Sequence, residues 1–259
     1  MTRRLPLAAA AAVLAATALA GCAQSAPAAQ PSASSAVTGS ITVDAAASLN
    51  HVFPALAESF EREHPGATVT FNFGGSSALA AAIVSGAPVD VFAAASSTTM
   101  RTVQDASLTA GEPAVVARNR LEIAVPPGNP GGVTGLRDFA DAAKTVVVCD
   151  EAVPCGAAAK QVFALAKVAA KPDSFEPDVT GVLTKVVGND ADAGLVYATD
   201  VRAAGAKVEG IPFAEAEEAV TDYPIAALKG SKRPALAAAW VAYVRAHERV
   251  LQSAGFLAP

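Results

Sequence analysis

The sequence predicts an α/β protein of two lobes, each a mostly parallel sheet flanked by helices. From residue 41 onward, short runs rich in strand-forming residues alternate with helical patterns, which is typical of parallel strands joined by right-handed crossovers. Two sets of these units are joined by RLEIAVPPGNPGG at 120–132, and TDYPIAALKG at 221–230 leads back. This arrangement predicts two lobes rather than one continuous sheet.

The N-terminus has the features of an export signal and is excluded from the fold. MTRRLPLAAAAAVLAATALAGC begins with two arginines, continues with a short apolar run, and ends in small residues. The Leu-Ala-Gly-Cys ending resembles the lipobox of bacterial lipoproteins, which implies a signal peptide at 1–21 and lipidation of Cys22. The alternative is an ordinary signal peptide with a chance cysteine. We therefore expect an exported protein anchored by lipid to the outer face of the cell membrane.

Residues 22–40 form the next segment, made almost entirely of Ala, Ser, Pro and Gln. Such a segment cannot bury a core and is typical of a flexible tether. Loss of the leader removes Arg3 and Arg4 and leaves 17 basic against 24 acidic residues, a net charge of −7. With few aromatic residues and no basic stripe, this composition argues against nucleic-acid binding.

The first strand-to-helix unit, ITVDAAASLNHVF at 41–53, ends its strand in three alanines and a serine. Pro54 is tolerated only in the first turn of a helix, so the helix is predicted to begin near Asn50, just beyond Ser48, and to end before Pro65. Apolar residues at intervals of three and four mark its buried face: Leu49, Val52, Phe53, Leu56, Ala57 and Phe60.

Three further units follow the same scheme. In the second, a strand at 69–73 leads through Gly74-Gly75-Ser76-Ser77 into a helix whose buried face is predicted to be Leu79, Ile83 and Val84, with Gly86 just beyond its end. The third runs from TVVVC through Pro154 and Cys155 into a helix. The fourth places a helix after Asp178 and a strand at 193–197.

Two cysteines, Cys149 and Cys155, lie six residues apart in the third unit. An exported protein meets an oxidising compartment, which favours a disulfide between them; two free thiols are the alternative. Closing so small a loop contributes roughly 2 kcal/mol. His51, His64 and His247 show no metal-ligand spacing, so no zinc site is expected.

Small residues at four helix starts suggest a purpose beyond capping. A helix N-terminus exposes unpaired N–H groups and carries roughly half a positive charge, and small side chains let an anion reach those groups. Serine and aspartate are also common as plain caps, which is the alternative at any single helix. In open α/β sheets such turns lie together at the carboxyl ends of the strands, so the sequence predicts an anion site there.

The ordered set of segments resembles the periplasmic molybdate-binding proteins of ABC transporters. The resemblance covers residues 40–259 and implies a type II periplasmic-binding-protein fold with a two-strand hinge, in which 41–120 and 223–259 form lobe 1 and 121–222 form lobe 2. The segments that carry it are ITVDAAASL, GGSSALAAAIVSGAPVDVFAAA, VPCGAAAKQ, PDVTGVL, GLVYATD and the closing RPALAAAWVAYVRAHERVLQSAGF.

By position, the resemblance implies that molybdate or tungstate is held between the lobes without cofactors, metal ions or charged side chains. Ser77 is the alternative to Ser76 if the turn is displaced by one residue. The implied donors are the hydroxyl and backbone N–H groups of Ser48 and Ser76, the backbone N–H groups of Cys155 and Val179, and the Tyr197 hydroxyl.

Several of these positions have other interpretations. Cys155 stands where the family often has a small residue such as alanine, and it would crowd the site unless Cys149 ties it back. Ser96, where relatives often carry aspartate, is interpreted as a neighbouring cap, and Tyr223 as hinge packing. Without the resemblance, Tyr197 reads equally well as a half-buried strand residue.

Two other functions remain open at this point: a binder of sulfate, phosphate or another small oxyanion, and an exported serine hydrolase using Ser48 and His51. GGSSA lacks the Gly-x-Ser-x-Gly elbow, PPGNPGGVTG is no nucleotide-binding loop, and no acidic residue is placed by sequence to orient His51. The prediction is therefore a monomeric binding protein, not an enzyme, that closes on an anion and docks on an ABC permease.

Overall fold

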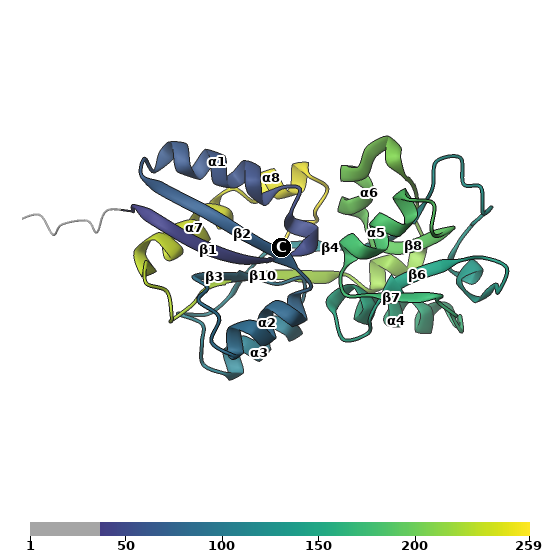
Figure 1. Ribbon diagram of the computed structural model, residues 1–259, viewed down its shortest axis with the longest axis horizontal. Coiled ribbons are helices and arrows are strands. Elements are labelled where there is room, and N and C mark those ends of the chain that lie inside the picture. Colours follow the sequence, from purple (N-terminus) through teal and green to yellow (C-terminus); the bar gives the residue numbers. More distant parts are fainter. Residues whose placement is uncertain (1–36) are drawn as a thin grey trace, which may run out of the picture. The chain divides into compact units, whose positions relative to one another are not determined.

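Figure 1 shows the computed structural model, which describes residues 37–259. The expected signal peptide, the lipidated Cys22 and the tether up to residue 36 lie outside the described residues. The strands are β1 (Gly39–Ala46), β2 (Ala67–Gly74), β3 (Val91–Ala93), β4 (Ala114–Asn119), β5 (Leu121–Val125), β6 (Val146–Cys149), β7 (Ser174–Glu176), β8 (Ala193–Tyr197), β9 (Glu209–Ile211) and β10 (Thr221–Ala227).

The α-helices are α1 (Phe53–Glu63), α2 (Ser76–Val84), α3 (Ser97–Asp105), α4 (Pro154–Ala166), α5 (Val179–Val187), α6 (Ala198–Ala204), α7 (Pro234–Ala246) and α8 (Glu248–Ser253). Short 3-10 turns are η1 (Ala47–Leu49), η2 (Leu136–Ala140), η3 (Gly205–Lys207) and η4 (Ala214–Glu218). β1 begins at Gly39, inside the segment expected to be tether.

The first sheet has the strand order β2-β1-β3-β10-β4, and with its helices it is called the first lobe. β1 pairs in parallel with β2 and β3, whereas β10 runs antiparallel to β3 and β4. In Figure 1, α1 lies over one face of this sheet, and α2 and α3 lie over the other.

The second sheet has the order β7-β6-β8-β5-β9, and with its helices it is called the second lobe. β6 pairs in parallel with β7 and β8, whereas β5 runs antiparallel to β8 and β9. Figure 1 shows α5 and α6 on one side of this sheet and α4 on the other. The structure therefore has the predicted two-lobed α/β fold.

Both sheets are mostly parallel, as predicted, and each contains one strand, β10 or β5, that runs antiparallel to the other four. The parallel strands β1, β3, β6 and β8 end at the junction of the lobes, whereas β5 and β10 begin there because the chain crosses between the lobes twice. A strand that enters a sheet from the junction runs against the strands that lead to it. The two crossing strands thus introduce the antiparallel pairs.

Aromatic packing holds the helices of the first lobe against the sheet and so keeps the strand ends in position. Trp240 of α7 is fully buried, and its ring packs edge-on against Phe53 and Phe60 of α1, with centroids 5.9 and 5.4 Å apart. A second buried cluster, which includes Phe92 and Met100, lies between the sheet and the helices α2 and α3. Burial of this kind stabilises by about 25 cal/mol per Å² of apolar surface.

Two local predictions need correction. α1 begins at Phe53 rather than near Asn50, because a proline at position 54 would clash with the carbonyl of Asn50 in a continuous helix; η1 forms instead as a separate turn. Val84 is 46% exposed at the end of α2 and does not belong to its buried face. Gly86, by contrast, adopts a φ of +95° beyond the helix end, as expected.

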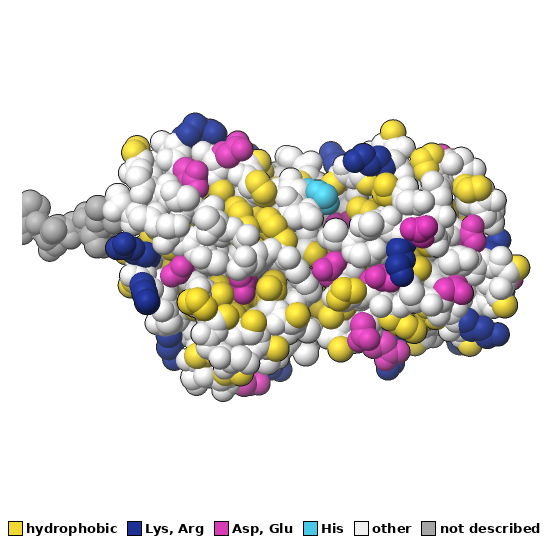
Figure 2. All heavy atoms as spheres, viewed as in Figure 1, with side chains coloured by type: hydrophobic (Ala, Val, Ile, Leu, Met, Phe, Trp, Pro, Cys, Tyr) yellow, Lys and Arg dark blue, Asp and Glu magenta, His cyan; other side chains and the backbone are white. Residues whose placement is uncertain are grey.

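Charge is spread thinly over the surface. Figure 2 shows Lys and Arg side chains scattered over the visible face rather than gathered into one stripe. Within residues 37–259, no helix has both the length and the apolar character needed to cross a membrane.

Candidate functional site

A small cavity lies at the junction of the lobes, beyond the carboxyl ends of β1, β2 and β8 and at the starts of η1, α2, α4 and α5. About 20 Å³ is open to the centre of a water-sized sphere, so the cavity admits an object only a few atoms across. The lining residues are Ala46, Ala47, Ser48, Gly74, Gly75, Ser76, Ala95, Val153, Pro154, Cys155, Asp178, Val179 and Tyr197. All five residues implied as ligands are among them.

Ser48 lies in η1, directly after the parallel strand β1, and is 2% exposed. Its Oγ forms a 2.7 Å hydrogen bond with the Oη of Tyr223, which comes from β10. Tyr223 is therefore more than the hinge packing expected from the sequence, because its hydroxyl contacts a hydroxyl that lines the cavity.

Ser76 and Ser77 separate clearly in the structure. Ser76 is the first residue of α2 and is 2% exposed, and its Oγ accepts a hydrogen bond from the backbone N–H of Ala95 at 3.0 Å. Ser77 instead donates to the carbonyl of Ala152 in the second lobe at 2.7 Å and does not line the cavity. The geometry thus favours Ser76 over Ser77 as a group facing a ligand.

The second lobe contributes two helix N-termini. Cys155 lies in the first turn of α4, and a disulfide joins it to Cys149 at the end of β6, with a Cα–Cα distance of 5.7 Å. Val179 is the first residue of α5. N–H groups in a first helical turn have no acceptor within their own helix, so both positions present donors toward the cavity.

Asp178 is the residue before α5, and its Oδ1 accepts the backbone N–H of Gly181 at 3.1 Å. It also lines the cavity, which the sequence analysis expected to lack charged side chains. Asp178 Oδ1 is therefore used in capping α5, and the other carboxylate oxygen is available to accept a hydrogen bond beside the donors of the cavity.

Tyr197 ends β8 and is 2% exposed. Its Oη is buried and has no hydrogen-bond partner among the described residues. Burial raises the pKa of Tyr197 far above its usual value, so the hydroxyl keeps its proton and acts as a donor at neutral pH. A buried hydroxyl without a partner costs about 1–3 kcal/mol, which an acceptor in the cavity would offset.

Asp200 holds the backbone of Tyr197 in place by accepting its N–H at 3.0 Å. Burial, followed by the nearby Asp178 carboxylate, raises the pKa of Asp200 to about 7, although the bond from Tyr197 opposes the shift. His51 Nε2 lies 3.9 Å from Asp200 Oδ1, and burial lowers the pKa of His51. Near neutral pH His51 is therefore mostly uncharged while Asp200 is only partly ionised, so the two groups form no strong ion pair.

This acidic neighbour of His51 was missed by the sequence analysis, which found no residue to orient the histidine. The contact brings together the turn between η1 and α1, which contains His51, and α6, about 150 residues further along the chain. A hydrolytic triad is still not assembled, because Ser48 Oγ bonds to Tyr223 and not to His51 in the described residues. Ser96, as interpreted, caps α3 by accepting the N–H of Thr99 at 3.1 Å.

Gly75 marks how closely the two lobes approach at the cavity. A Cβ at this position would meet the carbonyl oxygen of Pro177 in the second lobe well inside contact distance. The φ and ψ of Gly75, −61° and 122°, suit any residue, so glycine is required here by space alone. The lobes are closed around the cavity.

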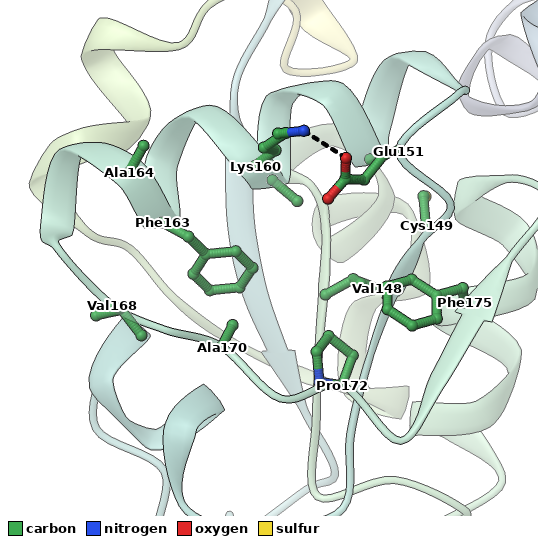
Figure 3. Close-up of a pocket in the computed structure, with 12 residues that line it drawn as sticks. Val148, Cys149, Glu151, Lys160, Phe163, Ala164, Val168, Ala170, Pro172 and Phe175 are labelled. Atoms are coloured by element: carbon green, nitrogen blue, oxygen red, sulfur yellow. Dashed lines mark hydrogen bonds and ion pairs between the residues drawn. The ribbon is translucent and has the colours of Figure 1, made fainter.

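A larger cavity lies behind α4, and Figure 3 shows it. It has about 320 Å³ open to water-sized spheres and is lined mainly by apolar side chains, including Val148, Phe163 and Phe175. Its charged groups, Lys160 and Glu151, pair with each other at 2.6 Å and are exposed. It is far larger than the small cavity at the lobe junction, but no buried donors converge on it. Residues 37–259 contain no cluster of His, Cys, Asp or Glu suited to hold a metal ion.

The family model for the bacterial extracellular solute-binding protein family matches residues 41–257. The chain belongs to this family. It is also 40% identical over 243 residues to the molybdate-binding protein ModA of Mycobacterium tuberculosis strain H37Rv, and the match covers 93% of each chain.

Two solved structures of solute-binding proteins share the fold. The periplasmic molybdate-binding protein of Azotobacter vinelandii superposes with a TM-score of 0.73 at 20% identity, covering 85% of this chain and 99% of the other. The sulfate-binding protein SubI of M. tuberculosis gives 0.72 at 16% identity, covering 84% and 86%. Membership of the family makes this chain an exported solute-binding protein, a class whose role is binding rather than catalysis.

Proposed function

We propose that this protein captures molybdate, with tungstate as a second cargo, and delivers it to an ABC permease. The observation that carries the proposal is the convergence of uncharged donors on one small closed cavity that no Lys or Arg lines. A tetrahedral dianion needs many short donors, and the 40% identical relative named for molybdate supports this cargo.

The proposed ligand set is the hydroxyl and backbone N–H groups of Ser48 and Ser76, the backbone N–H groups of Cys155 and Val179, and the Tyr197 hydroxyl. Charge-assisted hydrogen bonds contribute about 1.5–3 kcal/mol each before ordering and desolvation. Several of them with the helix dipoles correspond to about −8 to −11 kcal/mol, a micromolar to tens-of-nanomolar complex.

Both lobes supply donors, so only the closed form satisfies the anion fully. This differential affinity is what a ligand needs to shift the population toward closure. The closed form would then be the one that the permease recognises. The proposed anchor is a lipid on Cys22; a Cys22→Ala variant should leave the membrane fraction, and its retention there would argue against lipidation.

The alternative to molybdate, a monoprotonated oxyanion such as hydrogen phosphate, has one observation in its favour. Asp178 lines the cavity and has an oxygen not used in capping α5, so it offers an acceptor for an O–H group. A site without any acceptor would leave that proton unpaired and exclude the ion.

Titration calorimetry with molybdate, tungstate, sulfate and phosphate, in buffer free of all four, tests the proposal. Tight one-to-one binding of molybdate and tungstate with far weaker sulfate and phosphate is the expected result. If sulfate or phosphate bound most tightly, the oxyanion site would stand and the proposed cargo would be wrong. Absence of heat from all four would contradict the site itself.

A further inference from the structure

Four buried polar side chains form a chain of hydrogen bonds that ends at the cavity. Ser48 Oγ lies 2.7 Å from Tyr223 Oη, and Asn119 Nδ2 lies 3.5 Å from the same Oη and 2.8 Å from Thr199 Oγ1. All four residues are at most 3% exposed. Hydrogen bonds isolated from water in this way cannot be exchanged for bonds to solvent, so their direction matters.

The direction is set at Asn119. Its Oδ1 accepts the backbone N–H of Arg120 at 2.9 Å, which assigns the amide orientation and places Nδ2 toward Tyr223 and Thr199. An amide nitrogen donates and cannot accept. Tyr223 Oη therefore accepts from Asn119. Its only other hydrogen-bond partner in residues 37–259 is Ser48 Oγ, so the buried Tyr223 hydroxyl can place its own proton in a hydrogen bond only by donating to Ser48.

The consequence falls on Ser48. Because Ser48 Oγ accepts the proton of Tyr223, its own O–H is released from that bond and is free to point into the cavity it lines. Without Tyr223, the same hydroxyl could turn either a proton or a lone pair toward a ligand. The hydrogen bonds from Asn119 through Tyr223 to Ser48 are called the relay. The relay thus restricts the Ser48 hydroxyl, which could otherwise donate or accept, to donating into the cavity.

We propose that Tyr223 and Asn119 are positioning residues that commit the Ser48 hydroxyl to donate into the cavity, so that the site discriminates in favour of fully deprotonated oxyanions over monoprotonated ones. This inference rests on the proposed function, because it concerns how the oxyanion site discriminates between ligands. It adds two specificity-determining residues that do not line the cavity.

Tyr223→Phe removes the relay and keeps the ring, which packs edge-on against Tyr197 and Phe256 with centroids 5.9 and 5.2 Å apart. Calorimetry should show molybdate binding weakened about threefold to tenfold, the effect of one hydrogen bond. Phosphate binding should be unchanged or tighter, because Ser48 becomes able to accept from its O–H. The ratio of the two affinities should fall about tenfold, whereas an unchanged ratio would overturn the inference.

A double-mutant cycle with Ser48→Ala separates positioning from packing. If Tyr223 acts through Ser48, Tyr223→Phe should change molybdate affinity by less than about twofold in the Ser48→Ala background. An equal loss in both backgrounds would mean that Tyr223 only packs, and would overturn the inference. Tyr243→Phe is the matched control, because the Tyr243 hydroxyl bonds to Glu63 away from the cavity and should leave affinity unchanged.

Failure of the proposed function gives a different pattern. If the unmodified protein binds none of the oxyanions, both the proposed function and this inference fall together. If it binds molybdate and Ser48→Ala weakens binding while the cycle shows no coupling, the proposed function stands and the inference alone is wrong. Thermal unfolding of every variant confirms that the folded protein is being compared.

Discussion

Two cavities lie on either side of the Cys149–Cys155 disulfide, and they differ in volume and in the chemistry of their walls. Cys149 lines the larger cavity behind α4, and Cys155 lines the small one between the lobes. The larger has 320 Å³ and mainly apolar walls, while the smaller has 20 Å³ and buried hydroxyl and N–H groups. Unsatisfied donors in a closed space, rather than volume, distinguish a site for a small ion.

The strongest test of this contrast removes two hydroxyls from the small cavity. Ser48→Ala with Tyr197→Phe deletes one donor from each lobe, and each bond to a charged ligand contributes about 1.5–3 kcal/mol. We expect molybdate affinity, measured by calorimetry, to fall about 100-fold or more. An unchanged affinity would show that the anion binds elsewhere.

The buried carboxyl beside the small cavity should respond to pH. Because the pKa of Asp200 is raised to about 7 in the folded protein, its contribution to stability is fully present below its unfolded pKa of about 4 and is lost as pH rises toward 7. The loss is on the order of 4 kcal/mol.

Urea unfolding between pH 4 and pH 8 measures this loss. Asp200→Asn should flatten the pH dependence of the free energy of unfolding. The stability of this variant relative to the unmodified protein should therefore increase as pH rises. Glu151→Gln, which removes one partner of the exposed ion pair at the larger cavity, is the control and should change stability little. A parallel pH dependence in Asp200→Asn would contradict the assignment.

Closure around the small cavity should be sensitive to a single methyl group. In Gly75→Ala the new Cβ would collide with the carbonyl of Pro177, so the closed form should be disfavoured while each lobe remains folded. Molybdate affinity should fall about tenfold or more, with little change in thermal stability, since a competent state that is less populated binds less tightly. Small-angle scattering with saturating molybdate would reveal a variant that closes normally, which would refute this account.

The larger cavity supplies the smallest expected effect. Phe175 is 56% exposed at its rim, so Phe175→Ser should leave oxyanion affinity unchanged and alter the free energy of unfolding by no more than about 0.5 kcal/mol. A marked loss of affinity would assign the larger cavity a part in binding and would weaken the contrast.

Local patterns predicted much of the fold and of the candidate site. The starts of α2 and α5 at Ser76 and Val179 follow from strand, turn and helix signals within a few residues, and the two-lobed architecture follows from their repetition. The five candidate ligands came instead from the resemblance to the molybdate-binding family; all five line one cavity in the structure, and their role as ligands stays a prediction.

What local patterns missed depends on contacts between distant parts of the chain. Ser48 and Tyr223 are 175 residues apart, and Ser77 and Ala152 are 75 apart, so neither bond has a signal in a short window of sequence. Asp178 was recognised only as a helix start, because the direction in which a cap residue faces depends on how the lobes close. The one antiparallel strand in each sheet likewise arises from the two crossings between the lobes, which the residues of a single strand do not reveal.

The Cys149–Cys155 disulfide has a chemical consequence for the cargo. Within residues 37–259 it occupies both cysteines, so no nucleophilic or reducing sulfur borders the cavity. We infer that the small cavity between the lobes does not react with oxidising or thiol-seeking anions. Such anions would therefore leave the cavity chemically unchanged. Molybdate binding should accordingly survive treatment with an alkylating agent under non-reducing conditions, and inactivation by that reagent would contradict this inertness.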